Sequence, residues 1–588
     1  MRNYTVKADG TGVTLSGEGA PAGTAFLSGA ADTVVVQSLV WKRGQDSGKA
    51  KVLFDVLVDA DGAEGCYAPI SPNKQLQTEW YEYPVTNLSH SAPVLCCFDG
   101  RDRNVVTLAV SEVREDVRIR GGIQEESGRL HYSFTCDLPD GEVSGKIAFR
   151  LDLRGDPYES ALADTAAWWD EILKDPALPV PDSARLPMYS TWYAWHQDMQ
   201  SDELLSDYVR AAAIGMKSVI IDDGWQTSDN NRGYAFCGDW KPAGDKFPDF
   251  RDHVSKIHTL GMKCIVWFNV AAIGEKSAAF QMFQGRLLHR SPKEQTGVLD
   301  PRYPEVREYL TALYAIAVQS YGLDGLKLDF IDLFQHYEDT PDWNTGMDIR
   351  SIQDAAYRLM LQIETSLRKI RPDLLIEFRQ NYIGPSMRRF GNFFRVGDCP
   401  MSGYTNRVGI ADIRLLAGNS AVHSDMLMWA RNESPENIAR QLIDCIFGNL
   451  QISMRLDRLS EEQMLVLWHY LRFSVKYRKV LQEGTFTARD PLHGYTFLQS
   501  VLGSEGIGAV YQRDLVVQKP AECRRYRILN GTTEGRVLVE SDREGTWHTR
   551  ILDAFGQCLT EEDVKEEAGA LKVFAVPSGG SLLIEEKE

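Results

Sequence analysis

The 588-residue sequence has no apolar run long enough to cross a bilayer, which argues against an integral membrane protein. Its first ten residues, Met1 to Gly10, contain no apolar core of the kind that a signal peptide carries. From these two absences we expect a cytoplasmic protein that has no membrane partner.

Positive charge is also scarce. The chain has 64 Lys and Arg residues against 82 Asp and Glu residues, for a formal net charge of -18 at pH 7. Nucleic acids and anionic membrane surfaces attract basic patches, so this balance argues against either as a partner. A neutral or cationic small molecule suits the charge better. The sequence leaves open whether the chain forms homo-oligomers.

The ten cysteines do not follow the spacing of a metal site, and two of them, Cys96 and Cys97, are adjacent. Without an export signal, reduced thiols are expected rather than disulfides. The sequence offers no His-rich ligand set either. We therefore expect neither a metal nor another cofactor.

The sequence contains regions with different predicted secondary-structure patterns, which follow one another along the chain. Short strand-like segments separated by glycine and Asp/Asn turns predict an N-terminal antiparallel β-sandwich over residues 1–157. Helical composition and then a proline-rich stretch predict a linker over residues 158–185. Strand-like texture returns at the end of the chain, which predicts a smaller C-terminal antiparallel β-sandwich over residues 485–588.

Between these parts, residues 186–484 alternate strand-like and helical segments. Eight such units fit a (β/α)8 barrel, a fold of about 250 residues before insertions. A helix is predicted to begin at Pro304 and end near Gly322, and another to be capped by Ser201 and Asp202. The predicted barrel strands are residues 188–194, 218–223, 263–269, 325–330, 374–380, 393–398, 421–427 and 450–456.

The stretch Gly325–Phe330 reads as a buried strand that carries two charges. Its apolar residues alternate with Lys327 and Asp329, so both charged side chains belong to one face. Burying a lysine and an aspartate is costly unless they are paired or used in catalysis. From this stretch alone, a structural ion pair and a catalytic carboxylate remain equally good interpretations.

Polar residues also gather where other predicted barrel strands end, which is the face that carries active sites in this fold. Carboxylates interleaved with tryptophans are typical of a carbohydrate pocket, because acids accept hydrogen bonds from hydroxyls and indoles cover the apolar side of a sugar ring. Five such strand ends at one rim make a purely structural role improbable. The residues concerned are Trp192, Asp222, Asp223, Trp225, Asp239, Trp240, Trp267, Lys327, Asp329, Arg379, Asn381, Arg395 and Asp398.

This ordered set resembles glycoside hydrolase family 36, in the clan of α-galactosidases and plant raffinose synthases. Each motif is weak by itself, but their order and their placement on strands are specific, and the flanking β-domains match the family's three-part layout. The matching motifs are Trp192, Asp222-Asp223-Gly224-Trp225, Gly238-Asp239-Trp240 before Lys246-Phe247-Pro248, Gly261-Met262-Lys263 leading to Trp267-Phe268, Lys327-x-Asp329 and Arg395-x-Gly397-Asp398.

The resemblance implies a retaining α-glycosidase that acts as an α-galactosidase. Asp329 would attack the anomeric carbon, and Asp398 would protonate the leaving oxygen and later activate water. Asp329 needs a low pKa, which Lys327 is placed to provide, and Asp398 needs a raised one, which Arg395 would oppose. Gly397 is expected to let the chain turn so that Arg395 and Asp398 both face the pocket.

By the same resemblance, the remaining residues of the set would bind and enclose the sugar. Asp222 and Asp223 would accept hydrogen bonds from its outer hydroxyls, and Trp225, Trp240 and Trp267 would shape the pocket wall.

The fifth barrel strand departs from the family pattern. It has Arg379-Gln380-Asn381 where family α-galactosidases carry Cys-x-x-Gly-x-x-Arg, and the third strand has Asn269-Val270 in place of Pro-Glu. The resemblance to the family therefore predicts the reaction type better than it predicts which sugar is bound. Arg379 is expected to meet an acidic or modified sugar, or else to pair with Glu377 or Asp425.

Other functions stay open at this point. A transglycosylase of the raffinose-synthase type shares Asp222-Asp223-Gly224-Trp225-Gln226, and an α-glycosidase for a different sugar fits the altered fifth strand. A metal-dependent barrel lyase or isomerase would use acids of the rim as ligands, and a non-catalytic sugar-binding protein would need none of the chemistry. The sequence leaves the aglycone and the linkage open.

Overall fold

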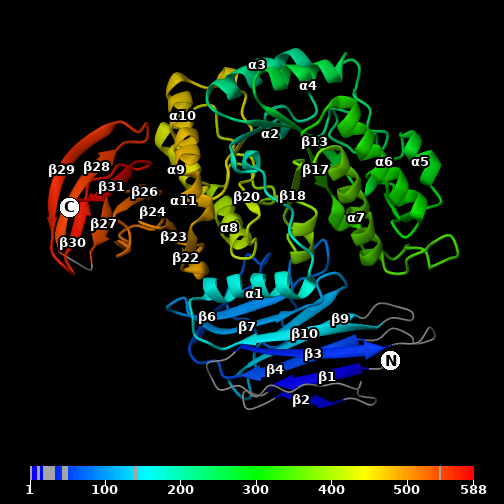
Figure 1. Ribbon diagram of the computed structural model, residues 1–588, viewed down its shortest axis with the longest axis horizontal. Coiled ribbons are helices and arrows are strands. Elements are labelled where there is room, and N and C mark those ends of the chain that lie inside the picture. Colours follow the sequence, from blue (N-terminus) through cyan, green and yellow to red (C-terminus); the bar gives the residue numbers. More distant parts are fainter. Residues whose placement is uncertain are drawn as a thin grey trace.

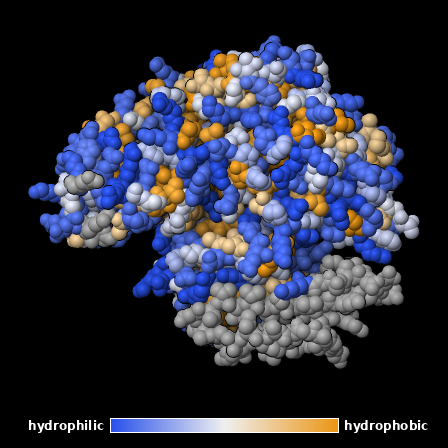
Figure 2. Space-filling model, viewed as in Figure 1, coloured by the Kyte–Doolittle hydropathy of each residue, from blue (hydrophilic) through white to orange (hydrophobic). Residues whose placement is uncertain are grey.

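The computed structural model describes residues 3–8, 13–16, 34–42, 51–137, 144–541 and 544–587. Two β-sheets at the N-terminus, a central barrel and a C-terminal pair of sheets follow one another along the chain (Figure 1). Hydrophilic residues predominate on the face shown in Figure 2, with hydrophobic ones in scattered small groups. The predicted fold class, a TIM barrel between two β-sandwiches, is confirmed. The exact domain boundaries stay predictions.

The N-terminal sheets pack face to face. The alternating burial of Lys51–Val58 shows the period of a strand with one face in the core, and Phe54 stacks on Phe149 across the interface with ring centroids 5.0 Å apart. One sheet contains, in spatial order, β2 (Val13–Ser16), β1 (Asn3–Ala8), β4 (Lys51–Val58), β9 (Leu130–Asp137) and β8 (Val117–Ile123). The other contains β3 (Val34–Lys42), β10 (Ser144–Asp152), β7 (Asn104–Val110), β6 (Val94–Asp99) and β5 (Ala63–Tyr67).

Antiparallel pairing dominates in this part of the chain, but β1 and β4 pair in parallel. Helix α1 (Tyr158–Leu173) lies between the sheets and the barrel, where the sequence predicts a connecting helix (Figure 1). The indole of Trp169, fully buried, donates to the carbonyl of Val110 on β7 and so fixes the helix on the sheet.

The barrel is an eight-stranded parallel sheet with its strands in the predicted order. The sheet is nearly closed, since isolated parallel bridges join His423 to Asn449 and Leu427 to Ile452 across the remaining gap. Several strands end earlier than predicted because the chain turns into loops at the polar residues. The strands are, in spatial order, β20 (Ala421–His423), β19 (Phe393–Arg395), β18 (Leu375–Arg379), β17 (Gly325–Asp329), β13 (Lys263–Asn269), β12 (Ser218–Ile221), β11 (Met188–Ser190) and β21 (Gln451–Ile452).

Helices cover the outside of the barrel. Helix α6 (Pro304–Tyr321) begins with proline and ends at Gly322, which has a φ of 73°, as predicted. Ser201 does not act as the predicted cap, because it is already inside α3 (Ser201–Ala213) and its hydroxyl meets the ring of His253. The other α-helices of the barrel region are α2 (Trp192–Trp195), α4 (Phe250–Thr259), α5 (Ala278–Phe283), α7 (Ile352–Ile370), α8 (Gly403–Arg414), α9 (Pro435–Asp444), α10 (Glu461–Lys476) and α11 (Arg478–Glu483).

An insertion that the sequence analysis missed follows β13. A small antiparallel sheet formed by β14 (Ala272–Gly274), β16 (Thr296–Leu299) and β15 (Leu287–Ser291) packs there with α5. Short 3-10 turns complete the barrel region: η1 (Asp182–Arg185), η2 (Ile331–Leu333), η3 (Pro385–Arg389) and η4 (Leu456–Arg458).

The C-terminal part again consists of two sheets, beginning after α11. Most of their strand pairs are antiparallel, but β24 pairs with β26 and β25 with β27 in parallel, so the prediction of a wholly antiparallel domain is wrong in this detail. The larger sheet contains β22 (Thr485–Arg489), β23 (Phe497–Leu502), β24 (Glu505–Val510), β26 (Arg525–Asn530), β31 (Ser581–Glu586), β28 (Gly545–Leu552) and β29 (Cys558–Glu566). The smaller one contains β25 (Val516–Gln518), β27 (Val537–Glu540) and β30 (Leu571–Phe574), and η5 (Pro491–His493) lies between β22 and β23.

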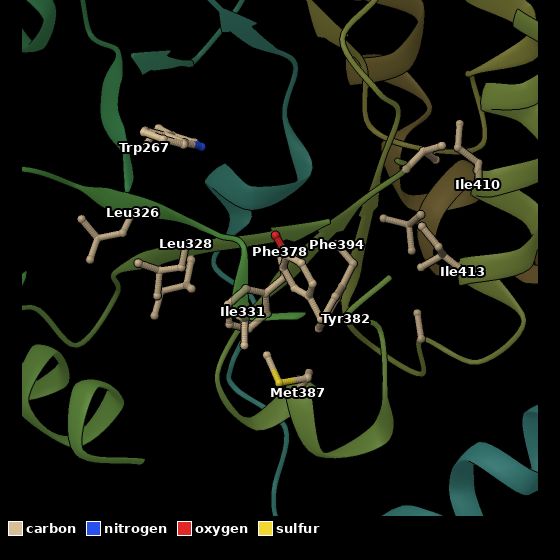
Figure 3. Packing of buried hydrophobic residues seen from close by; sticks show 14 of the residues in the cluster. Trp267, Leu326, Leu328, Ile331, Phe378, Tyr382, Met387, Phe394, Ile410 and Ile413 are labelled. Atoms are coloured by element: carbon tan, nitrogen blue, oxygen red, sulfur yellow. The ribbon is translucent and has the colours of Figure 1, made fainter. Parts of the chain in front are cut away.

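The alternation predicted for Gly325–Asp329 is present in the structure. Leu326 and Leu328 are fully buried in the core between strands and helices, where Figure 3 shows them near Ile331. Lys327 and Asp329 are also buried, but their polar atoms meet other charged groups. The strand therefore separates an apolar layer from a charged one, as its period requires.

Among the described residues, no helix is both long and apolar enough to traverse a bilayer. All ten cysteines are free thiols, as expected.

Candidate active site

The charged layer lies where neighbouring barrel strands end. In the sheet register Trp267 is opposite Lys327, and Asn269 is opposite Asp329. One strand further on, Lys327 is opposite Glu377, and Arg379 is opposite Arg395. Parallel strands present their carboxyl ends at the same rim, so residues distant in sequence are brought together there.

Asp329 is the most heavily hydrogen-bonded carboxylate of this rim. Its Oδ1 accepts from the Arg379 Nε at 2.7 Å, from the Tyr382 hydroxyl at 2.6 Å and from the Phe330 backbone N–H at 2.8 Å. Its Oδ2 accepts from the Trp267 indole N–H at 3.0 Å. Three donors therefore hold Oδ1, whereas Oδ2 keeps a free lone pair.

These partners decide the charge of Asp329. Burial acts to raise its pKa, but the Arg379 and Lys327 cations, together with the Tyr382 and Trp267 donors, outweigh burial and lower the pKa well below its usual range. The carboxylate is consequently ionised at neutral pH. The sequence-based expectation of an ionised buried aspartate is met, with Arg379 as the larger cationic contribution.

This depressed pKa has a measurable effect on stability. An Asp in an unfolded chain titrates near pH ~3.9, so on acidification the unfolded state takes up this proton before the folded state does. The contribution is fully present above the unfolded pKa and is lost as the pH falls. We expect the free energy of unfolding of the wild type to fall more steeply between about pH 5 and pH 3 than that of Asp329→Asn, as measured by urea denaturation.

A matched control is Asp373→Asn, because this side chain is 63% exposed. It should leave the pH dependence of the wild type unchanged. Parallel pH profiles for the wild type and Asp329→Asn would contradict the assigned charge state.

Lys327 has a different main partner from the one predicted. Its ammonium donates to Asp222 Oδ2 at 2.7 Å and lies 4.0 Å from Glu377 Oε1, so it acts on Asp329 only through space. Asp222 in turn accepts from the backbone N–H of Asp223. Asp222 and Lys327 thus form a buried ion pair beside the nucleophile candidate.

Arg379 pairs with Asp329, not with Glu377 or Asp425 as considered from the sequence. Glu377 and Asp425 both face Arg395 instead: the Arg395 Nη1 donates to Asp425 Oδ1, and its Nε lies 3.5 Å from Glu377 Oε1. Gln451 also donates to Glu377 at 2.6 Å. Which arginine meets which acid is decided by strand register, which the sequence does not display.

Asp398 is the exposed carboxylate of the rim. Its side chain is 56% exposed, and Oδ1 accepts from Arg395 at 3.0 Å. Burial acts to raise its pKa, but Arg395 and Lys327 lower it by more, while the Asp329 anion opposes them. The expected raised pKa is therefore wrong for the unliganded protein. The influence of Asp329 also shows that the two carboxylates share one electrostatic environment.

Gly397 does not have the special role predicted for it. Its φ is not among the positive values, and an added Cβ would meet only Gln380 atoms at 3.7 and 3.8 Å. Asp398 and Arg395 come together without a glycine-specific turn. The backbone N–H of Gly397 donates a hydrogen bond to the side-chain oxygen of Gln380 at 3.0 Å.

Asp223 lies beside Asp222 and is also buried. Gln197 and Gln226 each donate to one of its oxygens, both at 2.7 Å. Burial raises its pKa to about 6, despite these two donors. Each oxygen of Asp223 keeps a further lone pair, which could accept the predicted hydrogen bond from a sugar hydroxyl.

Three predicted site residues make contacts within the barrel region. Asp239 accepts from the backbone N–H groups of Ala278 and Ala279 and caps α5. Trp225 is fully buried, donates to the Trp267 carbonyl and stacks on Trp240, which is itself 4% exposed. Both indoles are buried and Trp240 packs edge-on against Trp267, so their predicted role in the pocket wall stays a prediction.

The remaining predicted residues lie at the rim in different settings. Trp192 is partly buried in α2, just after β11 rather than on it, with the Arg232 guanidinium 5.3 Å from its ring. Trp267 contacts the site through its indole N–H. Asn381 lies in the loop after β18, where its carbonyl accepts from the backbone N–H of Ser91 at 2.7 Å.

Sequence analysis missed two tyrosines of the site. Tyr382 binds Asp329, and the Tyr193 hydroxyl donates to Asp425 Oδ2 at 2.9 Å. Both follow strand ends, which is the signal that could have found them, but neither belongs to a charged pair. Among the described residues, no cluster of three or more His, Cys, Asp and Glu side chains is arranged to hold a metal ion.

Comparison with known proteins shows that the chain is similar to α-galactosidases. A family model described as Melibiase matches residues 178–378, which contain β11 to β17 and all of β18 except Arg379. The α-galactosidase Mel36A of Lactobacillus acidophilus is 24% identical over 332 residues, which are 52% of this chain and 42% of that protein. An α-galactosidase of Escherichia coli is 26% identical over 217 residues, 36% of this chain and 29% of that one. The chain therefore spans less than half the length of these curated relatives.

Solved structures show the same fold over nearly the whole chain. The galactosidase domain of the α-galactosidase–sucrose kinase AgaSK has a TM-score of 0.63 at 14% identity and covers 96% of this chain and 79% of that one. The GH36 α-galactosidase AgaA of Geobacillus stearothermophilus, in complex with 1-deoxygalactonojirimycin, has a TM-score of 0.66 at 14% identity and covers 94% and 79%. The resemblance to glycoside hydrolase family 36 is confirmed.

Proposed function

From this confirmed resemblance to the family 36 glycoside hydrolases, we propose that the protein is a retaining α-glycosidase, most specifically an α-galactosidase. The observation that carries the proposal is the setting of Asp329: a buried carboxylate kept ionised, with Oδ1 fixed by three donors and Oδ2 bound by the Trp267 indole alone, which leaves it a lone pair for attack. A second, exposed carboxylate, Asp398, follows β19, which lies two strands from β17 in the barrel sheet.

In the first step Asp329 Oδ2 attacks the anomeric carbon while the bond to the leaving oxygen breaks. Asp398 gives that oxygen its proton, and the sugar becomes esterified to Asp329. In the second step Asp398 takes a proton from water, which attacks the anomeric carbon and releases Asp329. Two inversions return the α configuration.

The negative charge of Asp329 acts on the pKa of Asp398 before the first step and is absent before the second. The Asp329 anion acts to raise the pKa of Asp398, although Arg395 and Lys327 keep that pKa below its usual range in the unliganded protein. Esterification neutralises Asp329 and removes that influence, which lowers the pKa and favours the base needed for the second step. Bound sugar also excludes water from the half-exposed Asp398, and this desolvation favours its protonated form.

The other carboxylates near Arg395 are unsuited to proton transfer. Asp425 is fully buried, and its oxygens accept from Arg395, Tyr193 and the Cys399 backbone N–H. Asp412 is bound by Lys74 and Tyr495, at the contact between the barrel and the flanking domains. Asp398 is the acid of this group with open access to a substrate.

The choice of galactose rests on the relatives, which are named α-galactosidases, and the loop after β18 departs from their pattern. The test is a panel of aryl α-glycosides, with the anomeric configuration of the first product followed by NMR. Release of α-galactose as the first product supports the proposal. A β first product, or preference for another sugar, contradicts the mechanism or the sugar respectively. Adding an oligosaccharide acceptor to the same assay distinguishes transfer from hydrolysis.

The proposed mechanism uses carboxylates alone, so chelation is expected to have no effect. Treatment with EDTA followed by gel filtration should leave kcat/KM of an aryl α-galactoside unchanged within error. Loss of activity that Mg²⁺ or Mn²⁺ restores would instead favour the metal-dependent lyase or isomerase considered from the sequence.

A further inference from the structure

A cavity of about 520 Å³ lies at the end of the barrel opposite the charged rim. Its lining includes Arg185, which precedes β11, and Ser420, which precedes β20, so the cavity lies where these parallel strands begin. The end of α8, the end of α11 and the start of β22 complete its walls (Figure 1). Its volume falls within the range of small-ligand sites, roughly 300–1,000 Å³.

Two arginines line this cavity, and the hydrogen bonds that they make among the described residues all go to carbonyl oxygens. Arg414, the last residue of α8, donates from Nη1 to the carbonyl of Phe447 at 2.9 Å and to that of Leu481. Arg185 donates from Nη2 to the carbonyl of Asn419. These carbonyls satisfy hydrogen bonds, but they do not neutralise the two positive charges.

The environment of both arginines disfavours an uncompensated charge. Burial and, to a smaller extent, the Arg185 cation lower the pKa of Arg414 to about 9. Burial also lowers the pKa of Arg185, although the Glu483 and Asp182 carboxylates act against it. Both guanidiniums still carry their charge at neutral pH, so an anion bound beside them would be favourable.

Both guanidiniums keep N–H groups that are free for a ligand. Nε and Nη2 of Arg414, and Nε and Nη1 of Arg185, have no hydrogen-bond partner among the described residues, yet none of these four atoms is buried. The guanidinium of Arg414 lies 4.0 Å from the ring centroid of Phe486, which restrains its plane. Planar guanidiniums held in this way present pairs of N–H groups that match the oxygens of a phosphate.

The two carboxylates of the lining are more exposed than the arginines. The Asp182 side chain is 85% exposed and lies 3.3 Å from the Arg478 Nη1, with which it forms an ion pair. Glu483 is also exposed, whereas Arg185 and Arg414 are partly buried. Water and salt screen exposed charges more strongly than partly buried ones, so the attraction of the arginines for an anion outweighs the repulsion by the carboxylates.

We propose that this cavity binds a phosphate group, either as free phosphate or as part of a small phosphate ester. Arg185 and Arg414 hold the phosphate oxygens, and the remaining volume accommodates the organic part of an ester. The site shares no residue with the charged rim, so it is independent of the proposed glycosidase function. Binding should stabilise the folded chain, because a ligand that binds only the native state raises the free energy of unfolding.

The experiment measures binding to the full chain by titration calorimetry in a chloride buffer of constant ionic strength. The probes are inorganic phosphate and glycerol 3-phosphate, with glycerol as the uncharged control. The wild type should bind one phosphate group per chain saturably and should not bind glycerol. Arg185→Gln should weaken the binding of both phosphates at least tenfold, because it removes one of the two cations.

The chain offers a matched control for the change in charge. Arg472 is exposed on α10 and does not line the cavity, so Arg472→Gln should leave phosphate binding unchanged. Glu483→Gln removes a carboxylate from the lining and should tighten phosphate binding. A cluster of arginines with a structural role alone would not show this gain.

Absence of saturable phosphate binding to the wild type would overturn the inference, as would equal affinities of the wild type and Arg185→Gln. If Arg185→Gln does not fold, Glu483→Gln decides: tighter binding supports the site, and an unchanged affinity overturns it. The two probes then identify the form of the ligand. Tighter binding of glycerol 3-phosphate assigns the site to a phosphate ester, and tighter binding of inorganic phosphate assigns it to the free ion.

Discussion

Asp329→Ala is expected to lower kcat by more than about 10³-fold, because no other group can form the covalent intermediate. The remaining side chains of the rim keep their partners, with Lys327 still paired to Asp222, so the variant should fold. Loss of an acceptor for Arg379 and Tyr382 will reduce its stability, which far-UV circular dichroism and a urea titration would quantify. A variant that keeps more than about a tenth of the wild-type rate would remove the assignment.

Azide provides the positive control for this variant. A small anion fits the space that the carboxylate leaves and can attack the anomeric carbon of an activated α-galactoside directly. The product should be the β-galactosyl azide, because only one inversion occurs. Rescue that gives the α-azide would show that another residue acts as the nucleophile.

The order of elements was accessible from the sequence because it depends on local patterns. Near-continuous apolar runs such as Val219–Ile221 predicted buried parallel strands, and the alternation around Lys327 predicted one charged face. These features depend on residues a few positions apart. The small sheet between β13 and α6 escaped notice because its strands are short and form an insertion.

The partners of the charged residues were not accessible in the same way. Arg379 and Arg395 both follow aromatic residues at strand ends, yet one binds Asp329 and the other binds Asp425 and Asp398. The choice depends on strand register and side-chain conformation, neither of which leaves a pattern in a single sequence. Asp239 shows the same limit, because capping α5 requires a backbone segment about forty residues away.

The aromatic residues near the rim lie at different depths in the barrel, and amino-acid composition does not reveal these depths. Trp267 donates to the nucleophile candidate, whereas Trp225 packs against Phe250 and Phe268 behind it. Both occur beside acidic residues in the sequence. A tryptophan next to a carboxylate in the sequence therefore indicates that a candidate carbohydrate site is near. It does not indicate whether that tryptophan contacts the residues of the site.

The second large effect is expected from Asp398→Ala, and it should depend on the substrate. Substrates with basic leaving groups, such as raffinose, need a proton in the first step and should lose at least about 10²-fold in kcat/KM, within the usual range for general acid catalysis. Activated aryl galactosides leave without protonation, so their first step should change little. Equal losses for both kinds of substrate would contradict the role of Asp398 as the acid.

For activated substrates the slow step should then become release of the sugar from Asp329, because no base activates the incoming water. A burst of the phenol should precede a slow steady state, and azide should accelerate turnover by attacking the intermediate without needing a base. The product should be the α-galactosyl azide, opposite in configuration to the product of Asp329→Ala. Because the Asp398 carboxyl is lost, the basic limb that its proton gives the wild-type kcat/KM profile should also disappear. A β-azide from Asp398→Ala would mean that its substrate bypasses Asp329, and the two carboxylates would have to exchange roles.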